Sequence, residues 1–313
     1  MGPFLKKVLY FFGFVLLSTL VLQTMLSIRI YNKTVRGHDN LYQTTNVNAD
    51  VVFLGSSRCW AHFDPAFFDT AFKLKSVNIG VDGHSEISMA ILRLKYYLSG
   101  NKPPGFAILS FDPLVYAGST THNLNFVHKD DFARYAFLPA QKNLPVLNYF
   151  KFSLPEKYIP LYSIFKYRLL KDCILLNNID NYVQYGYEKH DEFWDTTANP
   201  VSDILKNNFL KKEDIPSLTE SMDDLHKLCL KNNIKLLCIQ TPVYKIIYEK
   251  MVFLSTQRIC KELLIPFVDT NEDDIIDNLK YFYNSDHLNT NGVAKMNEIL
   301  KKDSVLSSFL NYN

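Results

Sequence analysis

Short apolar runs alternate with helical patterns along this chain, and the alternation restricts its fold more than any other feature. The runs end in turn residues and lie at 51–54, 76–79, 106–111, 235–239 and 266–268. Helical patterns follow at 86–98, 248–263 and 290–302. Strands that are apolar on both faces and alternate with helices favour a mostly parallel sheet covered on both sides. We therefore predict an α/β domain, and 313 residues are enough to bury a sizeable core.

An uncharged apolar stretch occupies residues 8–28 near the amino terminus. As a helix it would be about 31 Å long, close to the thickness of a hydrocarbon core. It is too long for a signal peptide and has no small-x-small cleavage site. A buried core helix is the alternative, but the stretch is apolar on every face. We predict a membrane anchor over residues 1–30, and the basic residues on its two sides do not decide its orientation.

Composition excludes several classes of protein. A hydrophobic fraction of 47% and an aromatic fraction of 14% exclude a disordered chain. The net charge is only +2 and the basic residues are scattered, so we expect no nucleic acid partner. The five cysteines and the acidic run at 272–277 lack metal-ligand spacing, and the cysteines are interpreted as small buried hydrophobes. We expect neither a metal nor a cofactor.

The middle of the chain has a different character. Polar residues at 31–49 predict a linker, after which the α/β domain is expected over 50–313. Strand patterns are weak between about 114 and 214, where Tyr and Phe are dense and prolines separate short helical patterns such as 162–176. We interpret this region as an insertion over the strand ends that acts as a lid or a substrate wall.

Two polar motifs lie where a parallel sheet places its sites, at the carboxyl ends of strands. Ser57 follows the first strand in a Gly-Ser-Ser turn, and His287 stands just before the last helix. A serine hydroxyl becomes a good nucleophile only when a base takes its proton, so the two residues complement one another. The glycine-rich turn after the second strand, with Asn78, Gly80 and Gly83, offers amide donors for an oxyanion. Each motif alone is also compatible with an ordinary turn or helix cap.

Taken together, these segments resemble blocks I, II and V of the SGNH/GDSL hydrolases. They are most similar to the membrane-anchored bacterial members that carry Gly-Ser-Ser and Asp-His-Leu-Asn motifs. The resemblance covers residues 50–113 and 234–302, and it implies a flavodoxin-like three-layer α/β/α sandwich that hydrolyses or transfers acyl esters. It also implies that Ser57 is the nucleophile and His287 its base, with Gly83 and the amide of Ser57 as oxyanion donors.

The sequence departs from the family pattern at two places. The block III Gly-x-Asn-Asp is missing, and Asp112 stands where an oxyanion-binding Asn would be expected. The family's acid lies three residues before the histidine, and that position is Asn284. Asp286 is the adjacent carboxylate, but a residue does not easily reach its own neighbour's ring. We therefore predict a Ser57–His287 dyad, with Asp286 as a possible third member.

The resemblance suggests a serine esterase or acyltransferase acting on O-acetyl esters of a cell-surface polysaccharide. It would be a single-pass protein of the bacterial inner membrane with an extracytoplasmic domain. Two alternatives stay open: a catalytically inactive scaffold for envelope polysaccharide assembly, and a lipase that uses the insertion as an interfacial lid. Trp60 and His62 are interpreted as walls of the site or as packing beneath it, and Tyr244 and Tyr248 as half-buried side chains.

Overall fold

A five-stranded parallel sheet forms the centre of the α/β domain, with strand order β2-β1-β3-β6-β7. The computed structural model describes residues 2–31, 44–81, 83, 86–111, 133, 135–137, 152–174, 183–198, 200, 215–245, 247–248 and 250–311. The strands are β1 (Val51–Leu54), β2 (Ser76–Asn78), β3 (Phe106–Ser110), β6 (Lys235–Gln240) and β7 (Phe267–Asp269). All five lie at predicted positions, with small differences at their ends.

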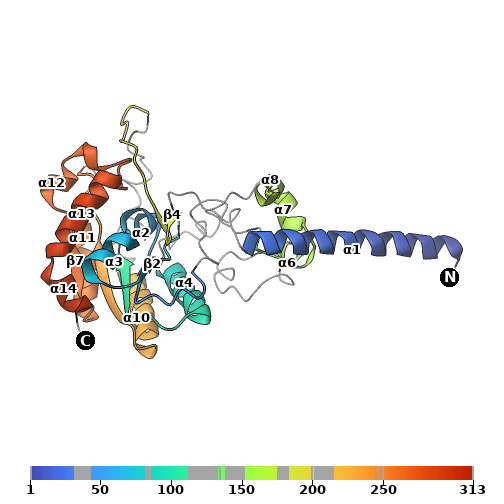
Figure 1. Ribbon diagram of the computed structural model, residues 1–313, viewed down its shortest axis with the longest axis horizontal. Helices are drawn as coiled ribbons and strands as arrows, with labels where there is room; N and C mark the ends of the chain where they lie inside the picture. Colours follow the sequence, from blue (N-terminus) through green and yellow to red (C-terminus); the bar gives the residue numbers. More distant parts are fainter. Residues whose placement is uncertain are drawn as a thin grey trace.

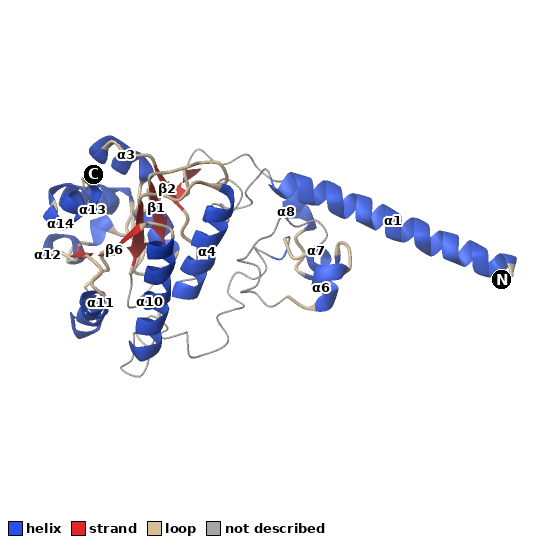
Figure 2. Cartoon of the chain, turned by 90° about the horizontal axis from the view of Figure 1, so that it is seen from below, coloured by secondary structure: helices blue, strands red, loops and turns tan. Residues whose placement is uncertain are grey.

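Helices cover both faces of the sheet and make it a three-layer sandwich (Figure 2). One face packs against α4 (Ile87–Gly100), α10 (Ile215–Lys231) and α11 (Lys250–Glu262). The other packs against α2 (Ser57–His62), α3 (Pro65–Phe72), α13 (Thr290–Lys302) and α14 (Ser304–Leu310). Two short helices, α12 (Asp273–Ile276) and η6 (Leu279–Tyr281), precede α13. All four residues of β1 are buried, which explains why the strands are apolar on both faces.

The strand order identifies the place where a site is expected. Numbered within the sheet the order is 2-1-3-4-5, the flavodoxin-like arrangement, so the predicted α/β/α sandwich is confirmed. The order reverses between β1 and β3, and ligands of such folds bind beyond the carboxyl ends of the strands at this switch point. Ser57 lies three residues after the end of β1 and is therefore at this position.

The helix α1 (Pro3–Tyr31) extends away from the sheet (Figure 1). Residues 3–27 are long and apolar enough to cross a membrane, as an anchor or a signal sequence would be, and only 6% of the apolar window is buried. It is therefore not a core helix of the sandwich. The helix is not exposed along its whole length, because Gln23, Leu26 and Ser27 are buried at its carboxyl-terminal end. Leu26 packs in one cluster with residues of the short helices α7 (Tyr162–Lys166) and α8 (Leu170–Ile174), which follow α6 (Leu154–Tyr158).

Two further elements differ from the prediction. The end of the predicted linker, residues 44–49, belongs to the domain: the backbone N–H of Ala49 donates to the hydroxyl of Tyr97 on α4 (2.8 Å). No element was predicted for 215–231, although its buried residues Leu218, Met222, Leu225 and Cys229 have helical spacing. Within the predicted insertion, β4 (Val183–Gln184) and β5 (Tyr187–Glu188) form an antiparallel hairpin whose β5 strand contacts α2.

Candidate active site

The turn between β1 and α2 presents Ser57 at the edge of the sheet. Gly55 has a φ of +145°, and a Cβ atom there would lie 2.9 Å from the Cβ atoms of both Cys59 and Ser110. Only glycine fits this close approach of β1, α2 and β3. Ser56 caps α2 by accepting the N–H of Arg58, so Ser57 becomes the first helical residue. The side chain of Ser57 is half-buried and remains accessible.

A tight loop before α13 carries His287. An antiparallel bridge between Phe282 and Leu288 closes this loop, and the N–H of Tyr283 donates to the carbonyl oxygen of His287 (3.1 Å). Asn289 caps α13 and donates from its side chain to the carbonyl oxygen of Phe282 (3.2 Å). The ring of His287 therefore projects from a loop whose ends are both hydrogen-bonded.

The structure brings Ser57 and His287 together. The Oγ atom of Ser57 lies 2.7 Å from Nε2 of His287, and Nδ1 of the same ring lies 3.0 Å from Oδ1 of Asn284. That oxygen also accepts the backbone N–H groups of Asp286 (3.1 Å) and His287 (2.8 Å), which identifies it as the carbonyl oxygen of the amide. Because a carbonyl oxygen only accepts, Nδ1 carries the proton and Nε2 is left to accept from Ser57. This is the tautomer that a general base requires.

Asp286 lies closer to the ring than expected. Its Oδ2 atom is 3.4 Å from Nδ1 of His287, so the side chain does reach its neighbour and that expectation was wrong. Burial opposes ionisation of this carboxyl group, but the adjacent His287 and the guanidinium of Arg58 outweigh burial and lower the pKa of Asp286. A carboxylate therefore lies beside the ring, while the shorter contact to Nδ1 is made by the neutral amide of Asn284.

A buried polar network of Arg58, Thr241 and His62 supports the dyad. Arg58 donates from Nη2 to the carbonyl oxygen (2.5 Å) and the hydroxyl (2.7 Å) of Thr241, at the end of β6. Nδ1 of His62 lies 2.9 Å from the same hydroxyl, and Nε2 of His62 accepts the backbone N–H of Leu288 (2.9 Å). Burial, together with the charges of Arg58 and His287, lowers the pKa of His62 well below its ordinary value. His62 is therefore neutral and holds the residue next to His287.

Two residues of the glycine-rich turn after β2, Asn78 and Gly80, have a role different from the predicted one. The amide of Gly80 donates to Oδ1 of Asn78 (3.0 Å), and the Asn78 side chain donates to the carbonyl oxygens of Cys59 (2.8 Å) and Phe63 (3.0 Å). Asn78 is fully buried. These donors are used to hold α2 against β2, so the assignment of Asn78 and Gly80 to an oxyanion or substrate site is corrected to a structural one.

Two other predicted residues of the site remain predictions. Gly83 has a φ of +66° in a turn and is half-buried, which leaves its oxyanion role open to test. Asp112 lies outside the described residues. Among those residues, no group of three or more His, Cys, Asp or Glu side chains is arranged to hold a metal ion.

A row of rings forms a wall beside the dyad. Tyr283 stacks between His287 (5.4 Å between ring centroids) and His190 (4.1 Å), and His190 in turn lies 5.4 Å from Trp60. His190 follows the β4–β5 hairpin, and its carbonyl oxygen accepts the N–H of Thr290 at the start of α13 (2.7 Å). A described part of the predicted insertion therefore contributes to the wall of the site.

Four residues near the site were not predicted from the sequence. Tyr283 and His190 form part of the wall beside the dyad, and Thr241 and Arg58 belong to the buried network that supports it. A signal existed for Thr241, because it follows β6 as Ser57 follows β1, at the same edge of the sheet. No local pattern pointed to His190. Tyr244 is half-buried, as expected, and its ring packs against Trp194.

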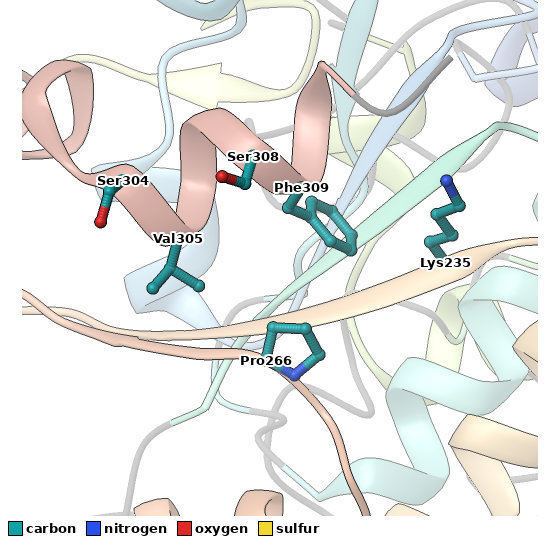
Figure 3. Close-up of a pocket in the computed structure, with 6 residues that line it drawn as sticks. All are labelled: Lys235, Pro266, Ser304, Val305, Ser308 and Phe309. Carbon is teal, nitrogen blue, oxygen red and sulfur yellow. The ribbon is translucent and has the colours of Figure 1, made fainter.

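A hollow of about 580 Å³ lies at the opposite edge of the sheet, near the starts of β6 and β7 (Figure 3). It is lined by Lys235, Pro266, Ser304, Val305, Ser308 and Phe309. Its size is in the range of small-molecule sites. It contains none of the residues of the dyad or its supports, so the chemistry described above belongs to the carboxyl-end site.

Comparisons with known proteins give matches among solved structures and no sequence relative. No family model and no curated protein matches the sequence. A Bacteroides fragilis protein assigned as an acylhydrolase overlays with a TM-score of 0.40 and 11% identity, covering 88% of this chain and 96% of its own. A GDSL-like lipase from Bacteroides thetaiotaomicron overlays with a TM-score of 0.37 and 13% identity. The overlay covers 80% of this chain and 85% of the lipase. The fold assignment therefore rests on the strand order and layers described above.

Proposed function

We propose that this chain is a membrane-anchored serine esterase or acyltransferase of the SGNH type. Ser57 is its nucleophile and His287 its general base. The observation that carries the proposal is the 2.7 Å contact between Oγ of Ser57 and Nε2 of His287, in the tautomer set by Asn284. A nucleophile within hydrogen-bond reach of a base that a third group orients is the arrangement that activates serine.

The reaction would proceed in two halves. Nε2 of His287 takes the Oγ proton as Ser57 attacks the acyl carbonyl, and the tetrahedral intermediate carries its negative charge on oxygen. Collapse of the intermediate breaks the ester bond, and the departing alkoxide receives the proton from His287. The acyl-enzyme is then attacked by water or by a second hydroxyl group, which passes its proton to His287. Collapse of the second intermediate breaks the bond to Oγ of Ser57, and His287 returns the proton to this oxygen.

The oxyanion donors in this proposal are backbone amides. Ser57 is the first residue of α2, where N–H groups have no acceptor within the helix. Gly83 is the second donor suggested by the family resemblance. One such donor typically contributes about 10²–10³ in rate.

The substrate class follows from the resemblance and from the aromatic wall. Tyr283 stacks on the ring of His287 and is half-buried, and an accessible aromatic face beside the dyad is suited to a sugar. We propose an O-acetylated cell-surface polysaccharide as substrate, with α1 spanning the bacterial inner membrane and the α/β domain on its outer side. The hydroxyl that accepts the acyl group in a transferase would belong to a second sugar.

Labelling with a fluorophosphonate probe tests the proposal without knowledge of the substrate. The full chain in detergent is expected to label at Ser57, and Ser57→Ala is expected to abolish labelling. Ser56→Ala is the matched control: it removes the helix cap, at a cost of about 1 kcal/mol in stability, but keeps the nucleophile. Labelling of Ser57→Ala at the parental level would refute the catalytic assignment.

A non-catalytic scaffold is the second candidate, and one observation favours it. The group closest to Nδ1 of His287 is the neutral amide of Asn284, which orients the ring but stabilises an imidazolium less than a carboxylate. A folded parent protein that binds acetylated polysaccharide but neither labels with the probe nor hydrolyses esters would support the scaffold.

A further inference from the structure

Exposed apolar side chains gather on the three short helices of residues 152–174. Six large apolar residues are exposed in this segment: Leu154, Tyr158, Ile159, Tyr162, Phe165 and Ile174. Only seven others are exposed in all the remaining described residues from 44 onward. Leu154 is 71% exposed and Phe165 57%. Soluble domains rarely leave so many apolar side chains together in water, so this segment needs a partner surface.

The same segment is folded against the end of α1 rather than against the sheet. Its helices α6, α7 and α8 lie beside the carboxyl-terminal part of α1 in both views (Figures 1 and 2). The N–H of Leu161 donates to Oε1 of Gln23 on α1 (2.7 Å). Leu26 packs in one buried cluster with Leu161, Ile164 and Cys173. The polar side chain of Gln23, almost fully buried although most of α1 is exposed, therefore serves to join α1 to this segment.

The position of this junction along α1 matches the boundary of a bilayer. The uncharged stretch from residue 8 to residue 28 rises about 30 Å, the thickness of a hydrocarbon core, and Gln23 lies in its last two turns, roughly 7–8 Å before its end. If α1 crosses the membrane, residues 152–174 meet it at the depth where hydrocarbon gives way to headgroups. Buried polar contacts such as that of Gln23 are the kind that helices use to associate at membrane depth.

The composition of the segment fits a headgroup region. It contains Lys157, Lys166, Arg168 and Lys171 against two acidic residues. One of these, Glu156, is buried and accepts from the hydroxyl of Tyr167 (2.6 Å) and from Lys166 (3.1 Å). Tyrosines and basic side chains beside apolar ones are typical of elements that lie in the membrane interface.

We propose that residues 152–174 form a membrane-interface element that inserts its exposed apolar side chains into the bilayer that α1 spans. The partner is a lipid surface with anionic headgroups. The element shares a buried cluster with Met89 and Tyr96 of α4, and it therefore connects the α/β domain to the membrane at a fixed point. This inference rests on the part of the proposed function that assigns α1 as a membrane span, and is independent of the catalytic chemistry.

Depth-dependent quenching in lipid nanodiscs tests the inference with the full chain. All five native cysteines are buried, so a cysteine introduced at an exposed position can be labelled selectively with an environment-sensitive nitrobenzoxadiazole dye. Phe165→Cys and Tyr158→Cys report on the element, and Phe14→Cys reports on α1. Leu264→Cys, 88% exposed on the α/β domain, is the matched control. Nanodiscs of zwitterionic and anionic lipids carry a nitroxide quencher near the headgroups or deep in the acyl chains.

Dyes at 165 and 158 are expected to emit at shorter wavelength and to lose roughly half of their intensity to the shallow quencher, as side chains at the headgroup boundary would. The dye at 14 is expected to respond more to the deep quencher, and the dye at 264 to neither. Quenching at 14 with no quenching at 165 and 158 would overturn the inference and leave the anchor intact. A dye at 165 that shifts without being quenched would also overturn it, because a protein surface would then cover the element. If the dye at 14 is not quenched, both the anchor and the inference fail, whereas probe labelling of Ser57 reports on the enzyme separately.

Discussion

The Oδ1 atom of Asn284 lies 3.0 Å from Nδ1 of His287 and accepts two backbone N–H groups of the same loop. An amide in this position sets the tautomer and orientation of the ring, which are two of the tasks of the acid in a serine triad. The third task, stabilising the imidazolium, requires charge, and the nearest carboxylate is Asp286 at 3.4 Å. Orientation and charge are therefore divided between two residues in this site.

Substitution of these two residues separates the tasks. Asn284→Ala removes the acceptor that holds the tautomer, and we expect a loss on the order of a hundredfold in kcat. Asp286→Asn removes only the charge, and we expect a loss in kcat of about tenfold or less, which corresponds to about 1.4 kcal/mol of transition-state stabilisation. Asn284→Asp is expected to raise turnover. The measurement is hydrolysis of a short-chain acyl ester, with the fold checked by circular dichroism. A loss on Asp286→Asn as deep as that on His287→Ala would show that Asp286 is the true acid.

His62 is expected to act as a positioning residue. Its Nε2 atom accepts the N–H of Leu288, so His62→Leu would release the loop that carries His287. We expect kcat to fall about 10- to 100-fold with little change in KM, because small misplacements of a catalytic group are costly and substrate binding is untouched. His62→Gln keeps an acceptor and should recover most of the rate. Equal losses in both variants would argue against this role.

The buried state of His62 also predicts a pH dependence of stability. Its pKa in the folded protein is lowered well below the ordinary value of 6.5, by burial and by Arg58, His287 and His190. Below pH 6.5 the unfolded chain binds a proton at this residue while the folded chain does not, so the free energy of unfolding falls as the pH decreases. Above this pH the contribution is constant. Urea unfolding of parent and His62→Gln between pH 5 and about 8 should show a steeper decline at the acidic end for the parent. Parallel curves would contradict the prediction.

Gly80 is expected to be essential for packing rather than for chemistry. A Cβ atom there would lie 2.9 Å from Cβ of Cys59 and 3.0 Å from both Ser56 O and Trp60 N. Gly80→Ala should therefore lower the free energy of unfolding by about 1–3 kcal/mol and weaken labelling of the displaced Ser57. Gly105→Ala is the matched control, because the nearest atom to a Cβ there is 3.8 Å away. Its stability should change by less than about 1 kcal/mol. A Gly80→Ala protein as stable as the parent would show that α2 moves without cost.

The sequence alone determined the α/β class, the five strands and the pairing of Ser57 with His287. These follow from local patterns: apolar runs closed by turn residues define strands, and the carboxyl ends of parallel strands share one edge. The pairing of Ser57 with His287 follows from a serine's need for a base together with the resemblance to the SGNH/GDSL motifs, which points to His287 among eight histidines. The apolar stretch at 8–28 predicted a long helix in the same way, because its length and lack of charge are properties of the sequence.

Only the tertiary structure decided which side chain faces each atom of the site. Asp286 and Asn284 both flank His287 in sequence, and the loop closed by Phe282 and Leu288 determines their distances to the ring. The donors of Asn78 and Gly80 are used within the fold because α2 packs closely against β2. His62 and Leu288 are 226 residues apart, and Gln23 and Leu161 are 138 apart. A hydrogen bond over such a separation depends on how the elements pack, and residue type and local periodicity carry no information about it.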